Sequence, residues 1–393
     1  MRGKRIFALT PTLSLLLAAG CTATDGDASD KSDIVIGASV ELTGPNSEIG
    51  TAYQQALRLK ADQLTASGAL RGRSIRLDIR DNRGESATAN TQMNDFANNP
   101  GVTAAVMGVC TECAVAAAPG INKKGLPTVV LAPSAQVSSP VADRKFMFKL
   151  APNVDHDSSA IVSELRRVLP EGSDVGVLTT NDAYGTEARD TMTRGLKGST
   201  LKDGPVGQFA TTATDLTAPV RTVTEGKNPP PAVVVMAFPT QARLAITTLR
   251  NTGYKGRIFL DASAAGDLFL PGNTAASAEN ASLVFTSTLA IDDVIATTPA
   301  NAARKQWFQD YTAQYGSYYA QASFAADAVQ LIADAVGRVG SASDRTAIRG
   351  AMETAQFDGL TGPVRFAPDN HSGLTPQSLT VLIARNGRWR LVA

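Results

Sequence analysis

The sequence predicts an α/β protein built from two similar lobes, each with a mainly parallel sheet. The first observation is that short runs rich in β-branched residues alternate with longer amphipathic stretches, which is typical of βα units. The second observation is that this alternation occurs as two successive series. The third is length, because roughly 360 residues follow an N-terminal segment of different character, enough for two lobes of ordinary size.

Candidate strands are the short runs of β-branched and other apolar residues. The first series consists of Ile34–Ser39, Ile75–Asp81, Val102–Met107 and Pro127–Ala132. The second series consists of Val175–Thr179, Ala232–Ala237, Ile258–Asp261 and Leu283–Ser287. Because a longer amphipathic stretch follows most of these runs, successive strands are expected to be parallel.

Candidate helices are the amphipathic stretches between these strands. Thr51–Ser67 carries an apolar stripe at helical spacing, and Gly68 ends it. Asp215 is placed to cap a helix over Leu216–Thr224. The longest helical pattern is the alanine-rich stretch Ala320–Val336.

The N-terminal segment predicts export. Met1–Arg5 carries three basic residues, and the apolar run Ile6–Ala19 that follows is too short for a stable membrane span. Leu17–Cys21 resembles a bacterial lipobox, which implies cleavage after residue 20 and lipidation of Cys21. An ordinary cleaved signal peptide and an uncleaved anchor are the alternatives. Residues 21–32, rich in Asp, Ser, Thr and Ala, are expected to be a flexible tether.

Composition excludes several function classes. Lys and Arg number 37 against 36 Asp and Glu, so charge gives no argument for nucleic-acid binding. The rest of the sequence contains no second apolar run long enough to span a membrane. The two histidines, His156 and His371, are far apart in sequence and offer little for metal or triad chemistry. We therefore expect no catalytic residue, no metal and no cofactor.

Several short motifs, in order over almost the whole remaining chain, resemble one family. They are Ile34–Ala38 with Leu42–Pro45 and Gly50, Gly68–Leu77 with Asp81–Asn82, Asn181–Gly185, Asp327–Ala328 and Gly362–Phe366. Together they are similar to the type I periplasmic binding proteins for branched-chain amino acids and related solutes. The resemblance implies two Rossmann-like lobes joined by three crossings, which we expect near Lys149–Pro152, Phe285–Thr288 and Asp358–Gly362. Lobe 1 would then comprise residues 33–150 and 287–358, and lobe 2 residues 151–286 and 359–393.

The resemblance also implies a function that is not enzymatic. The chain would be the receptor of an ABC importer, lipid-anchored to the outer face of the cell membrane, with permease subunits as partners. It would bind a small polar solute, an amino acid or a related compound, in the cleft between the lobes. A ligand-sensing lipoprotein without a transport role is the alternative within the same fold.

The resemblance places four candidate ligand residues in lobe 1. Thr111 matches a small hydroxyl residue that binds the ligand carboxylate, just before a helix expected from about Ala114. A helix start offers free N–H donors, although Thr111 alternatively caps the helix. Ser134, Ala135 and Gln136 match the second ligand loop. Glu112 departs from the family pattern, because a negative charge there opposes an anionic group.

Three further candidates come from lobe 2. Tyr184 would present its ring and hydroxyl to the cleft, or else pack at the surface. Phe238 matches an aromatic wall. Asp261 matches the acidic residue that receives a ligand ammonium, or alternatively caps the next helix. Ile49 is a second departure, since relatives place an aromatic residue there.

Cys110 and Cys113 form a C-x-x-C motif, for which three readings are open. An oxidising compartment favours a structural disulfide that stiffens the ligand loop. The two residues would otherwise be free thiols, or the redox centre of an exported thiol oxidoreductase. A zinc site lacks further ligands nearby in the sequence.

Overall fold

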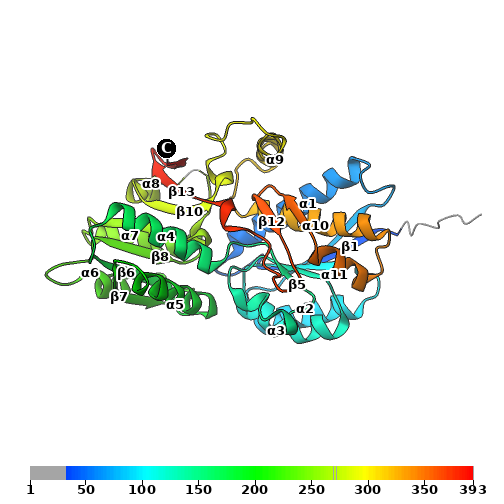
Figure 1. The fold of residues 1–393 in the computed structure, drawn as a ribbon, viewed down its shortest axis with the longest axis horizontal. Helices are drawn as coiled ribbons and strands as arrows, with labels where there is room; N and C mark the ends of the chain where they lie inside the picture. The colour runs from blue at the N-terminus through cyan, green and yellow to red at the C-terminus, as the bar shows by residue number, and fades with distance from the viewer. Residues whose placement is uncertain (1–31, 269, 271, 393) are drawn as a thin grey trace, which may run out of the picture.

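The computed structural model describes residues 32–268, 270 and 272–392, which form two lobes lying side by side (Figure 1). The predicted signal peptide, the lipidation site Cys21 and nearly all of the tether lie outside the described residues. In the part of the chain that is described, no helix has both the length and the apolar character that a membrane crossing needs.

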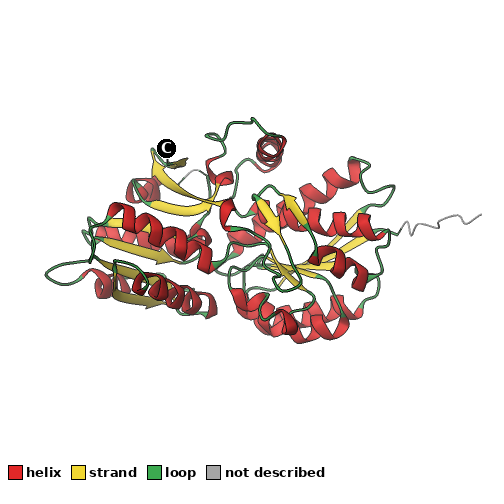
Figure 2. Cartoon of the chain, in the orientation of Figure 1, coloured by secondary structure: helices red, strands yellow, loops and turns green. Residues whose placement is uncertain are grey.

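Lobe 1 is built on a five-stranded parallel sheet with the strand order β2-β1-β3-β4-β5. Its strands are β1 (Ile34–Val40), β2 (Ile75–Asp81), β3 (Ala104–Met107), β4 (Thr128–Val130) and β5 (Met147–Lys149). Its helices are α1 (Ser47–Ala66), α2 (Ser86–Asn98), α3 (Thr111–Lys124), α10 (Ala322–Val339) and α11 (Arg345–Glu353). Figure 2 shows these helices layered around the sheet.

Alternate residues of the lobe 1 strands contribute to two separate cores. Ala104 and Val106 of β3 belong to the core that contains α1 and α10, whereas Ala105 and Met107 belong to the core formed with α2 and α3. Successive strand residues point to opposite faces, so a sheet covered on both faces needs apolar residues at every position. This requirement explains why the inner strands β1 and β3 are nearly continuous apolar runs, whereas the edge strand β2 carries charged residues.

Lobe 2 is built on a seven-stranded sheet with the order β14-β13-β10-β9-β8-β6-β7. Its parallel strands are β6 (Asp174–Thr180), β7 (Lys202–Phe209), β8 (Ala232–Met236), β9 (Arg257–Leu260) and β10 (Ser282–Thr286). The antiparallel hairpin of β13 (Leu379–Arg385) and β14 (Arg388–Leu391) extends one edge. Its helices are α4 (Val154–Val168), α5 (Ala183–Lys197), α6 (Thr217–Thr224), α7 (Pro239–Asn251) and α8 (Gly272–Ala278).

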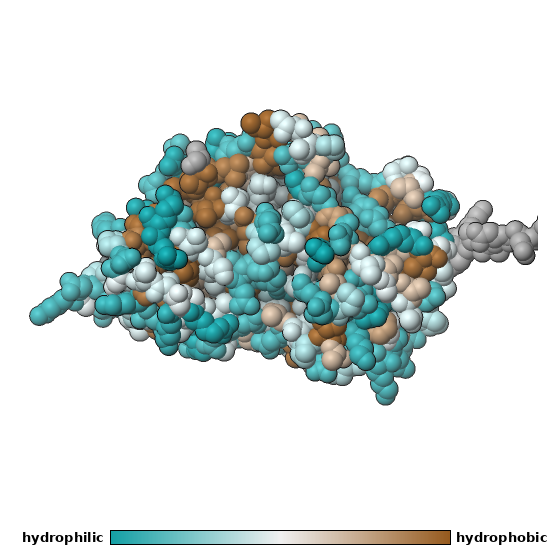
Figure 3. All heavy atoms as spheres, viewed as in Figure 1, coloured by the Kyte–Doolittle hydropathy of each residue, from teal (hydrophilic) through white to brown (hydrophobic). Residues whose placement is uncertain are grey.

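The remaining elements lie near the junction of the lobes. Helix α9 (Pro299–Tyr315) contacts lobe 1, where the Tyr311 hydroxyl donates to Oε1 of Gln55 at 2.7 Å. Figure 3 shows hydrophobic and hydrophilic residues interspersed on one face, with hydrophobic residues gathered over the upper part of lobe 2. Among the described residues, the large hydrophobic side chains that are exposed are Ile295 and Val392.

The chain crosses between the lobes three times, and the third crossing lies later than we expected. The hairpin of β11 (Gln356–Asp358) and β12 (Pro363–Arg365) is followed by a segment that pairs with lobe 1, through a bridge between Lys149 and Ser372. The chain then enters lobe 2 at β13. The third crossing is therefore close to Thr375–Ser378, and the prediction of Asp358–Gly362 is wrong.

Substitution of two helical glycines by alanine should change the free energy of unfolding in opposite directions. A Cβ on Gly50 of α1 would lie 1.9 Å from the carbonyl oxygen of Glu41, whereas a Cβ on Gly337 of α10 would meet no atom within 4 Å. We expect Gly50→Ala to lower the free energy of unfolding by about 2 kcal/mol or more, because rigid backbone must move. The matched Gly337→Ala should raise it by about 0.5–1 kcal/mol. Urea denaturation measures both, and equal effects would contradict the packing described for Gly50.

Candidate ligand site

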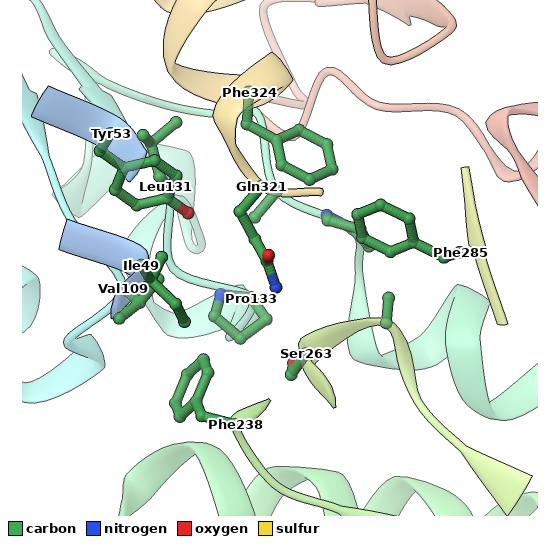
Figure 4. Close-up of a pocket in the computed structure, with 13 residues that line it drawn as sticks. Ile49, Tyr53, Val109, Leu131, Pro133, Phe238, Ser263, Phe285, Gln321 and Phe324 are labelled. Carbon is green, nitrogen blue, oxygen red and sulfur yellow. The ribbon is translucent and has the colours of Figure 1, made fainter. Parts of the chain in front are cut away.

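A small cavity of about 20 Å³ lies between the lobes, close to the carboxyl ends of strands from both sheets (Figure 4). A cavity of this volume holds about one water molecule. The lobes are therefore close together in this structure. In open α/β sheets, ligands bind beyond the carboxyl ends of the strands. The lining residues are Ile49, Tyr53, Val109, Leu131, Pro133, Ala151, Pro152, Phe238, Ala262, Ser263, Phe285, Gln321 and Phe324.

The cavity wall is mostly aromatic and aliphatic, with two polar side chains. Figure 4 shows Gln321 extending from the start of α10 toward the centre, between Phe324 and Pro133. Its Nε2 donates to the carbonyl oxygen of Ala265, while its Oε1 has no partner among the described residues. Ser263 Oγ is also buried without a partner of normal geometry. The cavity therefore offers polar atoms with unused bonding capacity to a solute of apolar body.

Next to this wall lies a buried acidic cluster in lobe 2. Asp261 directly follows β9, and its Oδ2 accepts a hydrogen bond from the Tyr184 hydroxyl in the first turn of α5. The Tyr184 ring packs on Phe238 with 5.0 Å between centroids. Burial raises the pKa of Asp261 to about 7 and raises that of Tyr184 above its usual value. Asp261 Oδ1 has no partner of normal hydrogen-bond geometry among the described residues, although Ser263 and the amide of Ala264 lie close enough to lower the pKa somewhat.

Asp157 of α4 is a second fully buried carboxyl in the same cluster. Burial, and then repulsion from Asp261, raise its pKa well above the usual value. Neither of its oxygens has a partner of normal hydrogen-bond geometry among the described residues, although the amide of Ala262 lies close enough to lower the pKa somewhat. Two adjacent buried carboxyls disfavour both being ionised, so the pair holds a proton more strongly than exposed carboxyls do.

Lys149, at the end of β5, is the buried cation nearest to this cluster. Its Nζ donates to the carbonyl oxygen of Pro133 and, at 2.6 Å, to Oδ1 of Asn153. Burial lowers its pKa to about 8, while Glu187 and Asp157 act in the opposite direction. The ammonium thus lies at the first crossing, where it ties β5 to the start of lobe 2.

The loop of residues 108–113, which contains Thr111 and is called the first ligand loop below, is held by side chains of its own lobe. Helix α3 begins at Thr111, three residues earlier than expected, because Cys110 is its N-cap and accepts from the Cys113 amide at 3.1 Å. Glu41 accepts from the amides of Val109 and Cys110 at 3.1 and 3.2 Å. Thr111 does not cap the helix, and its buried Oγ1 has no hydrogen-bond partner in the part of the chain that the structure describes.

Cys110 and Cys113 are joined by a disulfide in the structure. Glu41 and the two sulfurs lie within 4.8 Å of one another, a spacing that suits a metal ion. A disulfide sulfur is not a thiolate, so this group of three does not fit a metal site. The bonded pair instead closes the first turn of α3 beside the loop.

The second ligand loop contacts lobe 2 through a carboxylate that sequence reasoning missed. Glu187 of α5 accepts from the Ala135 amide at 2.9 Å, from the Ser134 hydroxyl, and weakly from Nε2 of Gln136 at 3.4 Å. Glu112 makes the reciprocal contact, because its Oε1 accepts from the Ala183 amide of α5 at 2.7 Å. Its charge therefore points to the start of a lobe 2 helix.

Of the seven predicted ligand residues, Phe238 lines the cavity directly. Ser134 and Asp261 each adjoin a lining residue in sequence, and Tyr184 contacts Phe238. Ala135 and Gln136 are brought to Glu187, and Thr111 lies at the start of α3. Ile49 does line the cavity. The sequence did not predict the lining residues Tyr53, Phe285, Gln321 and Phe324, nor the nearby carboxyls Glu187 and Asp157. Glu187 could have been found, because it lies three residues after Tyr184 and therefore on the same face of the helix.

Comparison with known proteins identifies the architecture. The profile of a family described as periplasmic binding protein matches residues 33–386. An extracellular ligand-binding receptor from Rhodopseudomonas palustris HaA2 is 19% identical with a TM-score of 0.81, covering 92% of this chain and 99% of that one. Leucine-binding protein LivK from Thermotoga maritima is 19% identical with a TM-score of 0.77, covering 92% and 98%.

A third similar structure was solved with a ligand. The branched-chain amino acid transporter substrate-binding protein LivJ from Streptococcus pneumoniae, in complex with isoleucine, is 21% identical with a TM-score of 0.76, covering 92% of this chain and 99% of that one. At these identities the likeness shows the fold. The predicted fold class, two α/β lobes of the type I periplasmic binding proteins, is confirmed.

The raised pKa of Asp261 predicts a pH-dependent stability. The folded carboxyl binds a proton more tightly than the unfolded one, whose ordinary pKa is 3.8, so stability falls as pH rises from about 4 to about 7. Asp261→Asn should flatten this decline, also because it removes a charge that repels Asp157. Urea midpoints at several pH values measure it, with Asp369→Asn at an exposed carboxyl as the control. A decline unchanged in Asp261→Asn would contradict the buried cluster.

Proposed function

The chain belongs to the periplasmic binding protein family, and from this premise we propose that it is the extracytoplasmic receptor of an ABC importer. It captures a small solute in the cleft between its lobes and presents the closed form to permease subunits. A lipid on Cys21 anchors it to the outer face of the cell membrane. The observation that carries the proposal is the interlobe cavity, in which an aromatic wall adjoins a buried carboxylate that keeps an unused oxygen.

The contacts that close the cleft support reversible capture. At the rim, Arg243 of α7 pairs with Glu48 of α1 at 2.7 Å, with both side chains partly exposed. Exposed ion pairs stabilise by about 0–1 kcal/mol, so this pair opposes opening only weakly. Deeper contacts, such as those of Glu187 with Ser134 and Ala135, are hydrogen bonds that water replaces when the lobes separate. A ligand that bridges both lobes then shifts the population toward the closed form.

The chemistry of the wall supports a solute with an apolar body and an amine. Phe238 and Ser263 come from lobe 2, whereas Ile49 and Tyr53 come from lobe 1, so a bound solute contacts both lobes. Asp261 adjoins this wall and is positioned to receive an ammonium group through a charge-assisted hydrogen bond. Amino acids and related amines share these two features.

Binding to the purified protein tests the proposal, with the aromatic wall as the mutated element. A solute found by thermal-shift screening of amino acids and amines should stabilise by about 2.7 kcal/mol at a hundred times its Kd. Phe238→Ala should weaken binding of that solute roughly 10- to 100-fold, since a buried aromatic side chain contributes about 1.5–3 kcal/mol.

The matched control is Phe146→Ala, at a half-buried ring of lobe 1 that is not part of the cavity wall. Its Kd, measured by calorimetry, should equal that of the wild type. Equal loss of affinity in both variants would place the solute outside this cavity. Absence of binding by every amino acid and amine would contradict capture of this class of solute.

A further inference from the structure

Several donors beside the cleft that could bind a ligand carboxylate are already taken by carboxylates of the chain itself. At the second ligand loop, Glu187 accepts from the Ala135 amide and the Ser134 hydroxyl. At the first ligand loop, Glu41 accepts from the amides of Val109 and Cys110. Three of these donors are amides at or beside helix starts, where an anion is favoured, and each is satisfied internally.

The donors at the start of α5, on the facing lobe, are satisfied in the same way. Glu112 accepts from the Ala183 amide at 2.7 Å, and Asp182 accepts from the Gly185 amide at 2.9 Å. A solute carboxylate could use these amides only by displacing one of these side chains, although the buried hydroxyls of Thr111 and Ser263 have no regular partner among the described residues. It would also lie close to their negative charges, which disfavours a second anion.

Several hydrogen-bond acceptors beside the cleft, in contrast, lack regular donors. Asp261 Oδ1, both oxygens of Asp157 and Gln321 Oε1 are buried and lack partners of normal hydrogen-bond geometry among the described residues. The nearby Lys149 ammonium donates to Pro133 and Asn153 instead. Leaving charged or polar acceptors buried and unpaired costs free energy, which a donor on a solute would recover. These acceptors favour a solute that brings hydrogen-bond donors, whereas the charges of Glu187 and Glu112 disfavour a solute that brings a carboxylate.

We propose that the solute of this protein is a small amine that carries an apolar body and no carboxylate. Its ammonium binds Asp261 and Asp157, and its body packs against Phe238, Phe285 and Phe324. Glu187 occupies the second ligand loop in place of a solute carboxylate. The inference rests on the proposed function, and it narrows the substrate class of the same cleft.

Three compounds that share one apolar body distinguish the possibilities. Calorimetry with 3-methylbutylamine, leucine and 4-methylpentanoate compares the amine, the amino acid and the acid, and phenethylamine with phenylalanine repeats the comparison for an aromatic body. We expect each amine to bind at least tenfold more tightly than its amino acid, and the acid not to bind. An amino acid that binds as tightly as its amine, or more tightly, overturns the inference and leaves the proposed function standing. Absence of binding by all five compounds overturns the inference, and the wider screen of amino acids and amines then decides the proposed function separately.

Substitution of Glu187 tests the stated cause of this selectivity. Glu187→Ala frees the donors of Ser134 and Ala135, so the preference for amine over amino acid, taken as the ratio of the two Kd values, should fall at least tenfold. Glu187→Gln removes the charge and keeps the shape, so the ratio of Kd values should fall in this variant too. It serves as the test if the alanine variant does not fold. Glu225→Ala, at an exposed carboxylate of lobe 2, is the control and should keep the wild-type ratio. An unchanged ratio in both Glu187 variants would overturn the role given to Glu187.

Discussion

The burial of carboxylates where the two lobes meet is the constraint on which the behaviour of the cleft depends. A buried carboxylate is tolerated when N–H groups satisfy its oxygens, and helix starts supply such groups. The half-buried carboxylates of Glu187 and Glu112 follow this rule, each with an amide of the opposite lobe as donor. The fully buried Asp157 and Asp261 do not, since three of their four oxygens lack regular partners within the described part of the chain. The amides at the interlobe helix starts are therefore satisfied, whereas most of the oxygens of these two carboxyls are not.

The crossings determine how this cleft can open. Residues 356–374 remain with lobe 1, because Phe366 packs edge-on against Phe148 and His371 stacks on the same ring. Movement between the lobes is therefore confined to short connections, such as residues 150–153 after β5 and 375–378 before β13. Lys149 lies beside the first of these, with its ammonium bound to groups on both sides of the crossing. Short hinges of this kind favour rigid-body closure over local rearrangement.

Local pattern predicted most inner parallel strands, which are apolar because both of their faces are covered, and it also predicted the edge strand Ile75–Asp81, in which apolar residues alternate with Arg and Asp. Ile75–Asp81 was predicted with its observed bounds, but Lys202–Phe209 was missed because glycines and a proline interrupt it. The strand ends placed Phe238 and Asp261 beside the cleft. Glu187 was beyond the reach of pattern, because a polar helix residue reads as solvent-exposed and its partners lie 52 residues away in the other lobe. The position of the third crossing was predicted wrongly for the same reason, since the bridge between Lys149 and Ser372 that keeps the preceding segment in lobe 1 is long-range.

Selectivity in such a cleft is a difference between free energies, and a protein can set it by opposing one class of ligand as well as by attracting another. In the proposed function, Asp261 attracts the ammonium group of amines and of amino acids alike, so it does not distinguish between these two classes of solute. Glu187 does separate them, because it holds the donors that a solute carboxylate needs and places a negative charge beside them. Displacing it would expose that charge in a closed, poorly hydrated space, where repulsion is least screened. The same side chain that joins the lobes therefore also limits which solute can lie between them.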